Sequence, residues 1–370
     1  MIVFFFFFLF TFLFFFLMIR RPPRSTQSRS SAASDVYKRQ ITLFGISLIV
    51  FSMIGMLSPY QRLATFISSP DRLKSENVDQ LISMYGLDDP IPIQYGRWFK
   101  NLLQGNLGWS YVGKAPVLQA LLQRFPYTLE LTLFSAIPII LIGTWMGVLS
   151  ALHHNRTLDH SLRIFAVVGW SFPDFVFGLF ILMIFYSTLG LFPPGNLSLW
   201  AESIVKSTSF RSFTGMTTID ALLNGRLDVF VNALRHLVGP VLTLTYVQLA
   251  YILRITRSSM LDVLQRDYVR TARAKGLDER VVINKHAKRN AMIPVATVSG
   301  QTIVGLMAGT VIVEAIFNRT GLGSFLALAA QQLDYASIMG GVLFFGLILI
   351  IGNLLVDISY AYIDPRVRLD

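Results

Sequence analysis

Long apolar stretches separated by polar segments are the feature that most restricts the fold of this chain of 370 residues. Hydrophobic residues make up 53% of it and charged residues only 14%. About 20 apolar residues suffice for a helix to cross the ~30 Å hydrocarbon core of a bilayer, and backbone groups in lipid must be hydrogen-bonded within their own segment. The sequence therefore predicts an all-α polytopic membrane protein with six transmembrane helices. These spans are expected at roughly 41–57, 128–151, 164–189, 237–256, 292–313 and 338–360.

The first forty residues differ in composition from everything that follows them. Ten of the first eighteen are phenylalanine, and the stretch after them reads "IRRPPRSTQSRSSAASDVYKRQ". Its basic residues follow the apolar run, whereas a signal peptide places them before it. This stretch resembles a translated sequencing adapter, so residues 1–40 are predicted to be an artefact that is absent from the native protein. The alternative is a genuine anchor helix followed by a serine-rich linker.

The basic connections between the spans predict their orientation, because Lys and Arg concentrate in the short cytoplasmic loops of membrane proteins. The basic segments here are 153–163, the insert between the fourth and fifth spans, and the tail 364–370. With six spans these segments fall on one side, so they and both native termini are expected to be cytoplasmic. The segments expected outside are 58–127, 190–236 and 317–337. The first of them is expected to expose aromatic side chains, Trp98 among them.

Polar residues within apolar spans are costly and are candidates for function. Asp174 follows Pro173 near the middle of the third predicted span. It is either a translocation-path carboxylate that contacts a cationic part of a substrate, or an acid that hydrogen-bonds the backbone around the proline. Glu130 and Glu314 lie near the outer ends of their spans, where they are expected to face water.

Two further patterns concern contacts between helices. Gly143 and Gly147 form a small-xxx-small pattern, which allows two helices to approach closely. Asn353 and Asp357 are four residues apart on one helical face. That spacing suits hydrogen bonding between helices better than transport chemistry.

Residues 267–295 form a long polar and basic insert between two very apolar stretches. A turn between two helices needs only a few residues. Helical spacing runs on both sides of Gly276, which is expected to take the positive φ that reverses a helix end. The insert is therefore predicted to form two short amphipathic helices joined at this glycine, the second ending before Pro294. Composition alone favours an interfacial helix pair on anionic lipid.

The order of residues in the insert resembles that of a known family. "RTARAKG" followed by "HAKRNAMIPV" resembles the EAA loop of ABC importer permeases, specifically their dipeptide/oligopeptide/nickel branch. Arg270, Thr271 and Ala272 stand where the general pattern has Glu-Ala-Ala, and Pro294 lies farther from the glycine than in that pattern. Other segments are similar to the same branch in the same order, namely "YGLDDPIPIQYGRWFKNLLQGNLGWSY", "RFPYTLELTLFSAIPIILIGTWMGVLSAL", "SFPDFVFGL" and "VEAIFNRTGLGSFLALAAQQLDY". The resemblance covers roughly residues 41–370.

The resemblance implies a type I ABC importer permease architecture. Its parts would be the first span with an external segment (41–127), the transmembrane domain (128–363) and the cytoplasmic tail (364–370). Residues 262–290 would form the coupling loop that docks on a separate ATPase. The residues assigned to this coupling are Arg270, Thr271, Ala272, Arg273, Ala274, Lys275, Gly276, Leu277 and Pro294. Asp174 and Pro173 are the candidates for the translocation path.

The resemblance also implies the partners. No GxxxxGK[ST] phosphate loop occurs in the sequence, so ATP and Mg are expected on partner ATPase subunits, and the chain itself is expected to be neither an enzyme nor a cofactor-binding protein. The absence of cysteine excludes disulfides and thiolate metal sites. The expected partners are a second homologous permease, two ATPase subunits, an external solute-binding protein and membrane lipid, with no nucleic acid. The expected location is the inner membrane of a prokaryote.

The cargo that the resemblance implies is a di- or oligopeptide. The same machinery also suits nickel chelates, glutathione or another small solute. An ion-coupled secondary transporter is the alternative from a different class, and it would show inverted repeats and paired acids at the midplane. Only Asp174 is an acid near the middle of a predicted span, and no convincing repeat is found.

Overall fold

The computed structural model describes residues 44–45, 47–48, 51–52, 55–63 and 78–363. It divides into two compact units. Unit 1 holds the chain up to Ala120 together with Leu333–Gly346, and unit 2 holds Leu121–Gln332 together with Leu347–Asp364. The predictions for residues 1–40 and for the tail 364–370 lie outside the described residues. So does part of the first predicted span, whose described residues between 44 and 55 are helical.

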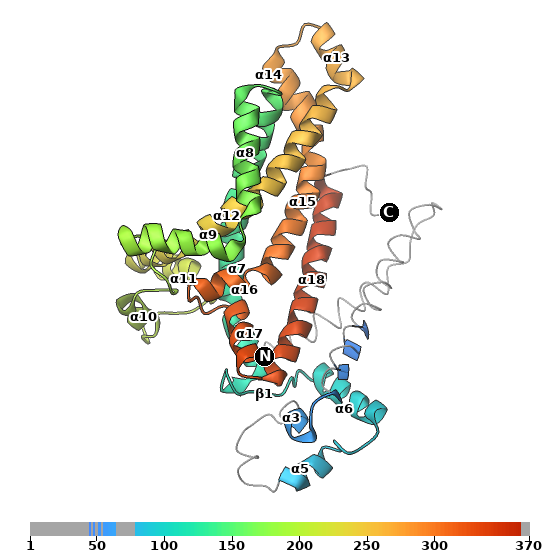
Figure 1. The fold of residues 1–370 in the computed structure, drawn as a ribbon, viewed down its shortest axis with the longest axis vertical. Helices are drawn as coiled ribbons and strands as arrows, with labels where there is room; N and C mark the ends of the chain where they lie inside the picture. Colours follow the sequence, from blue (N-terminus) through green and yellow to red (C-terminus); the bar gives the residue numbers. More distant parts are fainter. Residues whose placement is uncertain (1–43, 46, 49–50, 53–54, 64–77, 364–370) are drawn as a thin grey trace. The chain divides into compact units, whose positions relative to one another are not determined.

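Unit 1 is built from short helices, one β-hairpin and the beginnings of two long helices (Figure 1). Its elements are α3 (Pro59–Leu63), α5 (Val78–Met84), α6 (Ile91–Leu103), β1 (Trp109–Ser110), β2 (Ala115–Pro116), and the first turns of α7 (Val117–Leu152) and α18 (Tyr335–Ile363). The two strands pair antiparallel. Asp334 ties this hairpin to the start of α18, because its carboxylate accepts hydrogen bonds from the Ser110 hydroxyl at 2.8 Å and from the Ser337 hydroxyl at 2.8 Å.

Aromatic side chains form the core of unit 1. Phe51, Leu81, Trp98 and Met339 are buried together, and the Trp98 ring lies 5.6 Å from that of Phe51 and 6.1 Å from that of Tyr95. The expectation that Trp98 is exposed is wrong, since the side chain is only 6% exposed. The segment forms the amphipathic helix α6, which turns this tryptophan inward.

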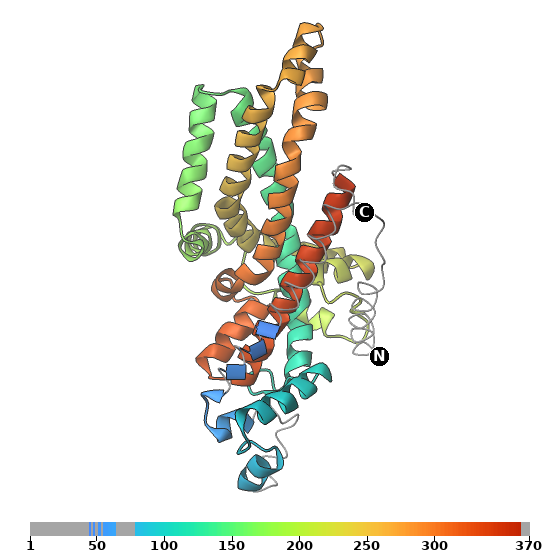
Figure 2. The ribbon, with the colours of Figure 1, turned by 90° about the vertical axis from the view of Figure 1, so that its right-hand side faces the viewer.

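Unit 2 consists of helices of very different lengths. They are α7, α8 (Thr157–Ser171), α9 (Asp174–Ile181) with the π-helical turns Leu182–Thr188, α10 (Leu199–Val205), α11 (Thr217–Leu223), α12 (Leu227–Leu264), α13 (Asp267–Ala274), α14 (Glu279–Val281) with the π-helical turns Val282–Ala287, α15 (Lys288–Gly309), α16 (Val311–Ile316), α17 (Leu322–Gln331) and the later part of α18. The helix α12 packs against α8, α9, α11, α15 and α16. It is therefore the helix around which unit 2 is assembled (Figures 1 and 2).

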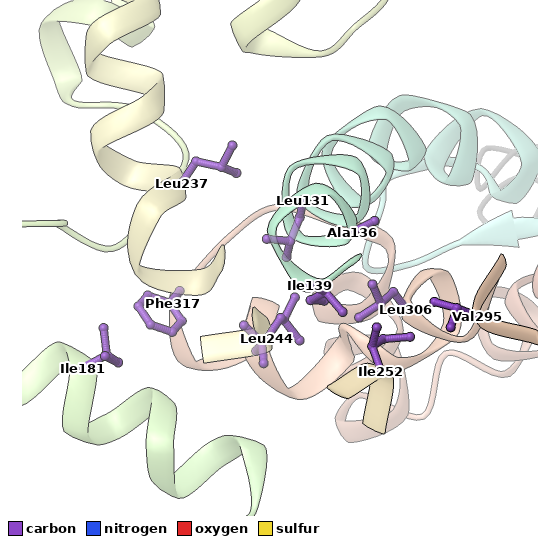
Figure 3. Close-up of a cluster of buried hydrophobic side chains, with 11 residues drawn as sticks. Leu131, Ala136, Ile139, Ile181, Leu237, Leu244, Ile252, Val295, Leu306 and Phe317 are labelled. Atoms are coloured by element: carbon purple, nitrogen blue, oxygen red, sulfur yellow. The ribbon is translucent and has the colours of Figure 1, made fainter. Parts of the chain in front are cut away.

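The largest core cluster of unit 2 lies where α7, α12 and α15 meet. Leu131 and Ile139 from α7, Leu244 and Ile252 from α12, and Leu306 from α15 are all buried in it (Figure 3). The gain of about 1.5–3 kcal/mol per buried side chain applies to removal from water, and lipid tails are as apolar as these side chains. In lipid the gain comes from packing between helices, so the close fit of these side chains fixes the three helices relative to one another.

Three described helices are long and apolar enough to cross a membrane, namely α7, α12 and α18 over Tyr335–Val356. A fourth span results if the pair α8 and α9 is counted as one. The third predicted span, 164–189, is not one straight helix, because α8 and α9 are bent by 101° at their junction. Phe172 is extended there, as a residue before proline prefers, and Pro173 lacks the N–H that a continuing helix requires. The fifth predicted span is occupied by α15, which is 22 residues long.

The small-xxx-small pattern of α7 faces α12. A Cβ atom added at Gly147 would lie 2.5 Å from Cβ of Thr256 and 2.8 Å from the carbonyl oxygen of Leu253. A Cβ at Gly143 would lie 2.9 Å from Cβ of Ile252. The two glycines therefore let the backbones of α7 and α12 approach within one chain, as close packing of small residues predicts.

We expect the substitution Gly147→Ala to lower the stability of the protein by about 1–3 kcal/mol, because overpacking a tight contact forces side chains or backbone to shift. The matched control is Gly96→Ala in α6, where an added Cβ meets no atom within 4 Å. Thermal unfolding of both variants in detergent measures the difference. Equal unfolding temperatures would show that α7 and α12 do not pack through Gly147.

Candidate functional site

The basic insert forms a helical hairpin between α12 and α15. The helix α12 ends at Leu264, α13 begins at Asp267, and Gly276 follows α13 with φ of +75°. The amides of Gly276 and Leu277 donate to the carbonyl oxygens of Arg273 and Ala272, at 2.9 and 3.4 Å, which closes the end of α13. The positive φ expected for Gly276 is confirmed. We call residues 265–281 the hairpin from here on.

The second helix of the hairpin runs on without a break. The Asp278 side chain accepts from the amide of Arg280 at 2.7 Å and so caps α14. From there the chain stays helical through the π-helical turns into α15. The expectation that this helix ends before Pro294 is wrong. Pro294 lies inside α15, beyond the hairpin, and α14 and α15 belong to one uninterrupted helical segment.

The hairpin has a small core of its own. Val269 and Ala272 from α13 and Val282 after α14 are buried together, with Val263 from α12 packed against them. Of the three residues that stand in the EAA-like positions, Ala272 is therefore buried, whereas Arg270 and Thr271 are exposed. The small side chain at 272 is what lets α13 lie against the start of the second helix.

A second cluster joins the base of the hairpin to the long helices. Ala151 of α7, Met260 of α12, and Ala287 and Ala291 next to and in α15 are buried together. The Ser259 hydroxyl donates to the carbonyl oxygen of Ala291 at 2.8 Å, which links α12 directly to α15. The hairpin and the ends of three helices thus form one packed body at the end of unit 2 (Figure 2).

The outer surface of the hairpin mixes cations with exposed apolar side chains. Arg273, Ala274 and Lys275 are exposed, and so are the larger apolar residues Tyr268, Leu277 and Val281. These three larger apolar side chains are therefore exposed, whereas Val269 and Ala272 of the same hairpin are buried. Exposed apolar side chains rimmed by charges are typical of a surface that contacts another macromolecule.

An ion pair braces the turn of the hairpin. The Arg273 guanidinium donates to both oxygens of the Glu279 carboxylate, at 3.1 and 2.6 Å. The hydrogen bonds from Arg273 hold the pKa of Glu279 below its usual range, and the same bonds raise the pKa of Arg273. The stabilisation is therefore present at neutral pH and is lost as the pH falls through the lowered pKa of Glu279.

A buried carboxylate holds α8 against α12 close to the hairpin. Asp159 in the first turn of α8 accepts two hydrogen bonds from the Arg257 guanidinium of α12, both at 2.8 Å. It also accepts from the Ser150 hydroxyl of α7 and from the amide of Asn155. The carboxylate is fully buried and saturated with donors, so it fixes the positions of three helices.

The two candidate residues of the translocation path lie at the bend between α8 and α9. Pro173 is exposed, and Asp174 is half-buried at the first position of α9. The structure gives Asp174 neither a hydrogen bond nor an ion pair with any described residue, and α9 has no side-chain cap. The alternative in which Asp174 bonds the backbone around the proline is therefore not realised. Its role in the path stays a prediction.

Glu130 and Glu314 are buried in the protein, so the expectation that they face water is wrong. Glu130 of α7 accepts from the amide and hydroxyl of Thr218, both at 2.7 Å, and from Arg319 at 3.3 Å. Glu130, Glu314 and Arg319 are each no more than 2% exposed. The partners come from α11 and the segment after α16, far from Glu130 in sequence, so local hydropathy gave no signal of them.

The Glu314 carboxylate completes this buried polar cluster. It accepts from the hydroxyl of Thr128 at 2.6 Å, from that of Thr310 at 3.1 Å and from the amide of Ser324 at 3.0 Å. Thr128 in turn accepts from the amide of Leu322. The two carboxylates thereby join α7, α11, α16 and α17. No group of three or more His, Asp or Glu side chains suited to a metal ion occurs in the described part of the chain.

The helices and their buried polar contacts define an integral membrane protein with several spans and a structured polar hairpin at one end. The chain belongs to the family of binding-protein-dependent transport system inner membrane components. The profile of that family matches residues 139–369, and the profile of its N-terminal region matches residues 34–132. Family membership agrees with the resemblance found in the sequence.

Curated relatives match over most of the chain. A probable D,D-dipeptide transport system permease protein of Escherichia coli is 39% identical over 330 residues, covering 88% of this chain and 94% of its own. A di/tripeptide transport system permease protein of Pseudomonas aeruginosa is 38% identical, covering 88% and 95%. An oligopeptide transport system permease protein of Bacillus subtilis is 36% identical, with the same coverage of 88% and 95%.

We expect Glu130→Ala to destabilise the protein by about 3–5 kcal/mol, because it leaves the buried Arg319 charge without its ion-pair partner. The control is Glu202→Ala, which removes the exposed partner of Lys206 and should cost less than about 1 kcal/mol. The readout is thermal unfolding in detergent together with the amount of protein recovered from membranes. A Glu130→Ala variant as stable as the control would mean that Arg319 is not held by this carboxylate.

Proposed function

We propose that this chain is a transmembrane permease subunit of an ATP-driven importer for di- and oligopeptides. It would form part of the translocation path and couple that path to ATPase subunits on separate chains. The identity of 36–39% to relatives named as dipeptide and oligopeptide permeases supports the peptide cargo. The one structural observation that carries the coupling role is the hairpin, with its exposed apolar and basic surface and its packed connection to α12 and α15.

The proposed partners follow from the same assignment. A second homologous permease completes the membrane part, two ATPase subunits bind and hydrolyse ATP with Mg, and an external solute-binding protein delivers the peptide. The six-span, type I arrangement is part of this proposal. So is the orientation, in which the hairpin and both native termini are in the cytoplasm of a prokaryote, at its inner membrane.

The proposed coupling uses the mechanical continuity of the hairpin. Its outer surface, with Leu277, Arg270 and Lys275, docks on an ATPase subunit. Closure of the ATPase pair displaces the hairpin, and the core around Ala272 keeps α13 and the second helix moving together. Because α14 continues into α15 and the hairpin begins directly after α12, both long helices receive the displacement. Two arrangements of the spans that ATP biases differently are what such a machine requires.

We expect Gly276→Val to reduce peptide uptake at least about ten-fold and to weaken retention of the ATPase subunits, since a β-branched residue is strongly disfavoured at positive φ. An added Cβ at Gly276 meets no atom within 4 Å, so the effect arises from the backbone conformation and not from a clash. Uptake and co-purified ATPase are measured at matched membrane abundance of the variant and the wild type.

Two controls accompany the Gly276 variant. Gly276→Asn should retain most of the uptake, because asparagine tolerates the left-handed conformation better than other side chains. Lys288→Ala removes an exposed charge outside the hairpin and should change little, since such charges contribute under about 1 kcal/mol. Normal uptake and normal ATPase binding by Gly276→Val would contradict the coupling role of the hairpin.

The proposed orientation predicts which side of the membrane reaches α6. Because the chain has no cysteine of its own, a single introduced cysteine is a clean probe. Trp98 is buried and therefore unsuitable, whereas Ile93 is 50% exposed. In intact cells, Ile93→Cys should react with a membrane-impermeant maleimide added from outside. Reaction only after the reagent is given access to the cytoplasm would reverse the orientation.

A further inference from the structure

One face of α12 is polar within a helix that is otherwise suited to a membrane. Gln248, Tyr251, Arg254 and Ser258 follow one another at intervals of three, three and four residues, which places them on the same side of the helix. All four are partly or fully exposed, whereas Leu249, Ile252 and Leu253 beside them are buried. A polar face that points away from the core of a spanning helix normally lines a water-filled path or a binding site.

A pocket opens on this polar face. Its volume is about 340 Å³, and it lies among α8, α12 and α15 of unit 2. The residues of its wall that carry polar or aromatic groups are Trp170, Gln248, Tyr251, Gln301 and Thr302. Ligand pockets of about 300–1,000 Å³ typically combine an apolar wall with a few polar groups that orient the ligand. The two glutamine amides can each donate to a carbonyl and accept from an amide, which suits a peptide bond.

Arg254 lies next to this pocket, over two of the aromatic rings in its wall. Its guanidinium carbon lies 5.6 Å from the centre of the Trp170 ring and 5.7 Å from that of Tyr251. Both rings line the pocket, so the stacking holds the cation at the rim of the cavity. The side chain is exposed, and the structure gives it no hydrogen bond or ion pair with any described residue.

Arg257, three residues further along α12, differs from Arg254 in having a carboxylate partner. The Arg257 guanidinium makes two hydrogen bonds to the buried Asp159 carboxylate, so its charge is fully used within the scaffold. Arg254 lacks such a carboxylate and lies two residues before the end of the segment 237–256 that is predicted to cross the membrane. A cation there is costly unless an anion or water meets it. When the face of a guanidinium stacks on an aromatic ring, the N–H groups along its edge remain available. Two of them can donate in parallel to the two oxygens of a carboxylate.

We infer that Arg254 receives the C-terminal carboxylate of the transported peptide, with Gln248 and Gln301 positioned for its last peptide bond. This inference rests on the proposed function and deepens it, because it names the end of the substrate that the path recognises. The aromatic rings of Trp170 and Tyr251 hold the guanidinium in place and leave room for a side chain of the peptide. The site would recognise any short peptide with a free carboxyl end, irrespective of sequence.

The first experiment measures uptake by vesicles that contain the complete importer with its binding protein. A tripeptide with a free carboxylate and the same tripeptide with a C-terminal amide are each transported by the wild type and by Arg254→Gln. The ratio of the wild-type rate to the variant rate is taken for each peptide, so that any preference of the binding protein cancels. We expect a ratio of at least about ten for the free acid, because the variant lacks the charge-assisted hydrogen bonds to the carboxylate, and a ratio near one for the amide.

Two variants control for structural damage. Arg254→Lys retains the positive charge but lacks the paired N–H donors of a guanidinium, so it should recover part of the uptake of the free acid. Arg226→Gln removes an arginine from the other end of α12, where it pairs with Asp228, and should give the same ratio for both peptides. Equal ratios for acid and amide in Arg254→Gln would overturn the inference. A wild-type importer that carries neither peptide would overturn the proposed function instead.

The second experiment tests the charge of the pocket without transport. Gly305 lines the pocket, and a Cβ added there meets no atom within 4 Å, so Gly305→Cys places a thiol in the cavity. Within this background, an anionic methanethiosulfonate should react faster than a cationic one, and Arg254→Gln should abolish the preference. The free-acid tripeptide should protect the thiol better than the amide does. The absence of any preference for the anionic reagent would show that another group neutralises Arg254 and would overturn the inference.

Discussion

The packing of α12 against its neighbours is the constraint on which the rest of unit 2 depends. Gly143 and Gly147 let α7 approach it closely, and Arg257 binds the buried carboxylate of α8. The same helix carries the polar face around Arg254 and leads, ten residues later, to its end at Leu264 and the hairpin. At 1.5 Å per residue the end of α12 and Arg254 are about 15 Å apart along one continuous helix. In the proposed importer, movement of the hairpin therefore reaches the proposed carboxylate site through a single rigid element.

The charged residues within the helical part of unit 2 fall into two groups, those with partners and those without. Asp159 with Arg257, and Glu130 with Arg319, are buried pairs that join helices distant in sequence. Removing one member of such a pair leaves an uncompensated charge, so these residues hold the scaffold together. Asp174 and Arg254 form no ion pair with any residue that the structure describes. A charged residue in a spanning helix that forms no ion pair within the protein is a candidate for binding a solute.

Part of this structure can be predicted from local sequence, and the successes share one property. The positive φ of Gly276, the helices on both sides of it and the close packing of the α7 glycines each depend on a few neighbouring residues. The incorrect predictions concern features that depend on contacts between residues distant in sequence, or on a backbone preference of proline that the hydropathy of the segment does not reveal. Glu130 is buried because Thr218 and Arg319 meet it. The predicted third span is apolar throughout 175–185, yet Pro173 bends it, because a missing N–H outweighs a continuous hydropathy signal.

The bend at Pro173 lies between the residue over which Arg254 stacks and Asp174. Trp170, the residue before the last one of α8, lies beneath the Arg254 guanidinium, and Asp174 begins α9 four residues after it. A straight helix would have carried Asp174 one turn further along the same face as Trp170, whereas the bend by 101° directs α9 across the end of α8 (Figure 1). Arg254 thus lies over the last turn of α8 and Asp174 in the first turn of α9, and neither forms an ion pair with any described residue. A short peptide carries one charge of each sign at its ends, so in the proposed importer Arg254 would receive the carboxylate, and Asp174 stays the predicted contact for a cationic part of the same solute.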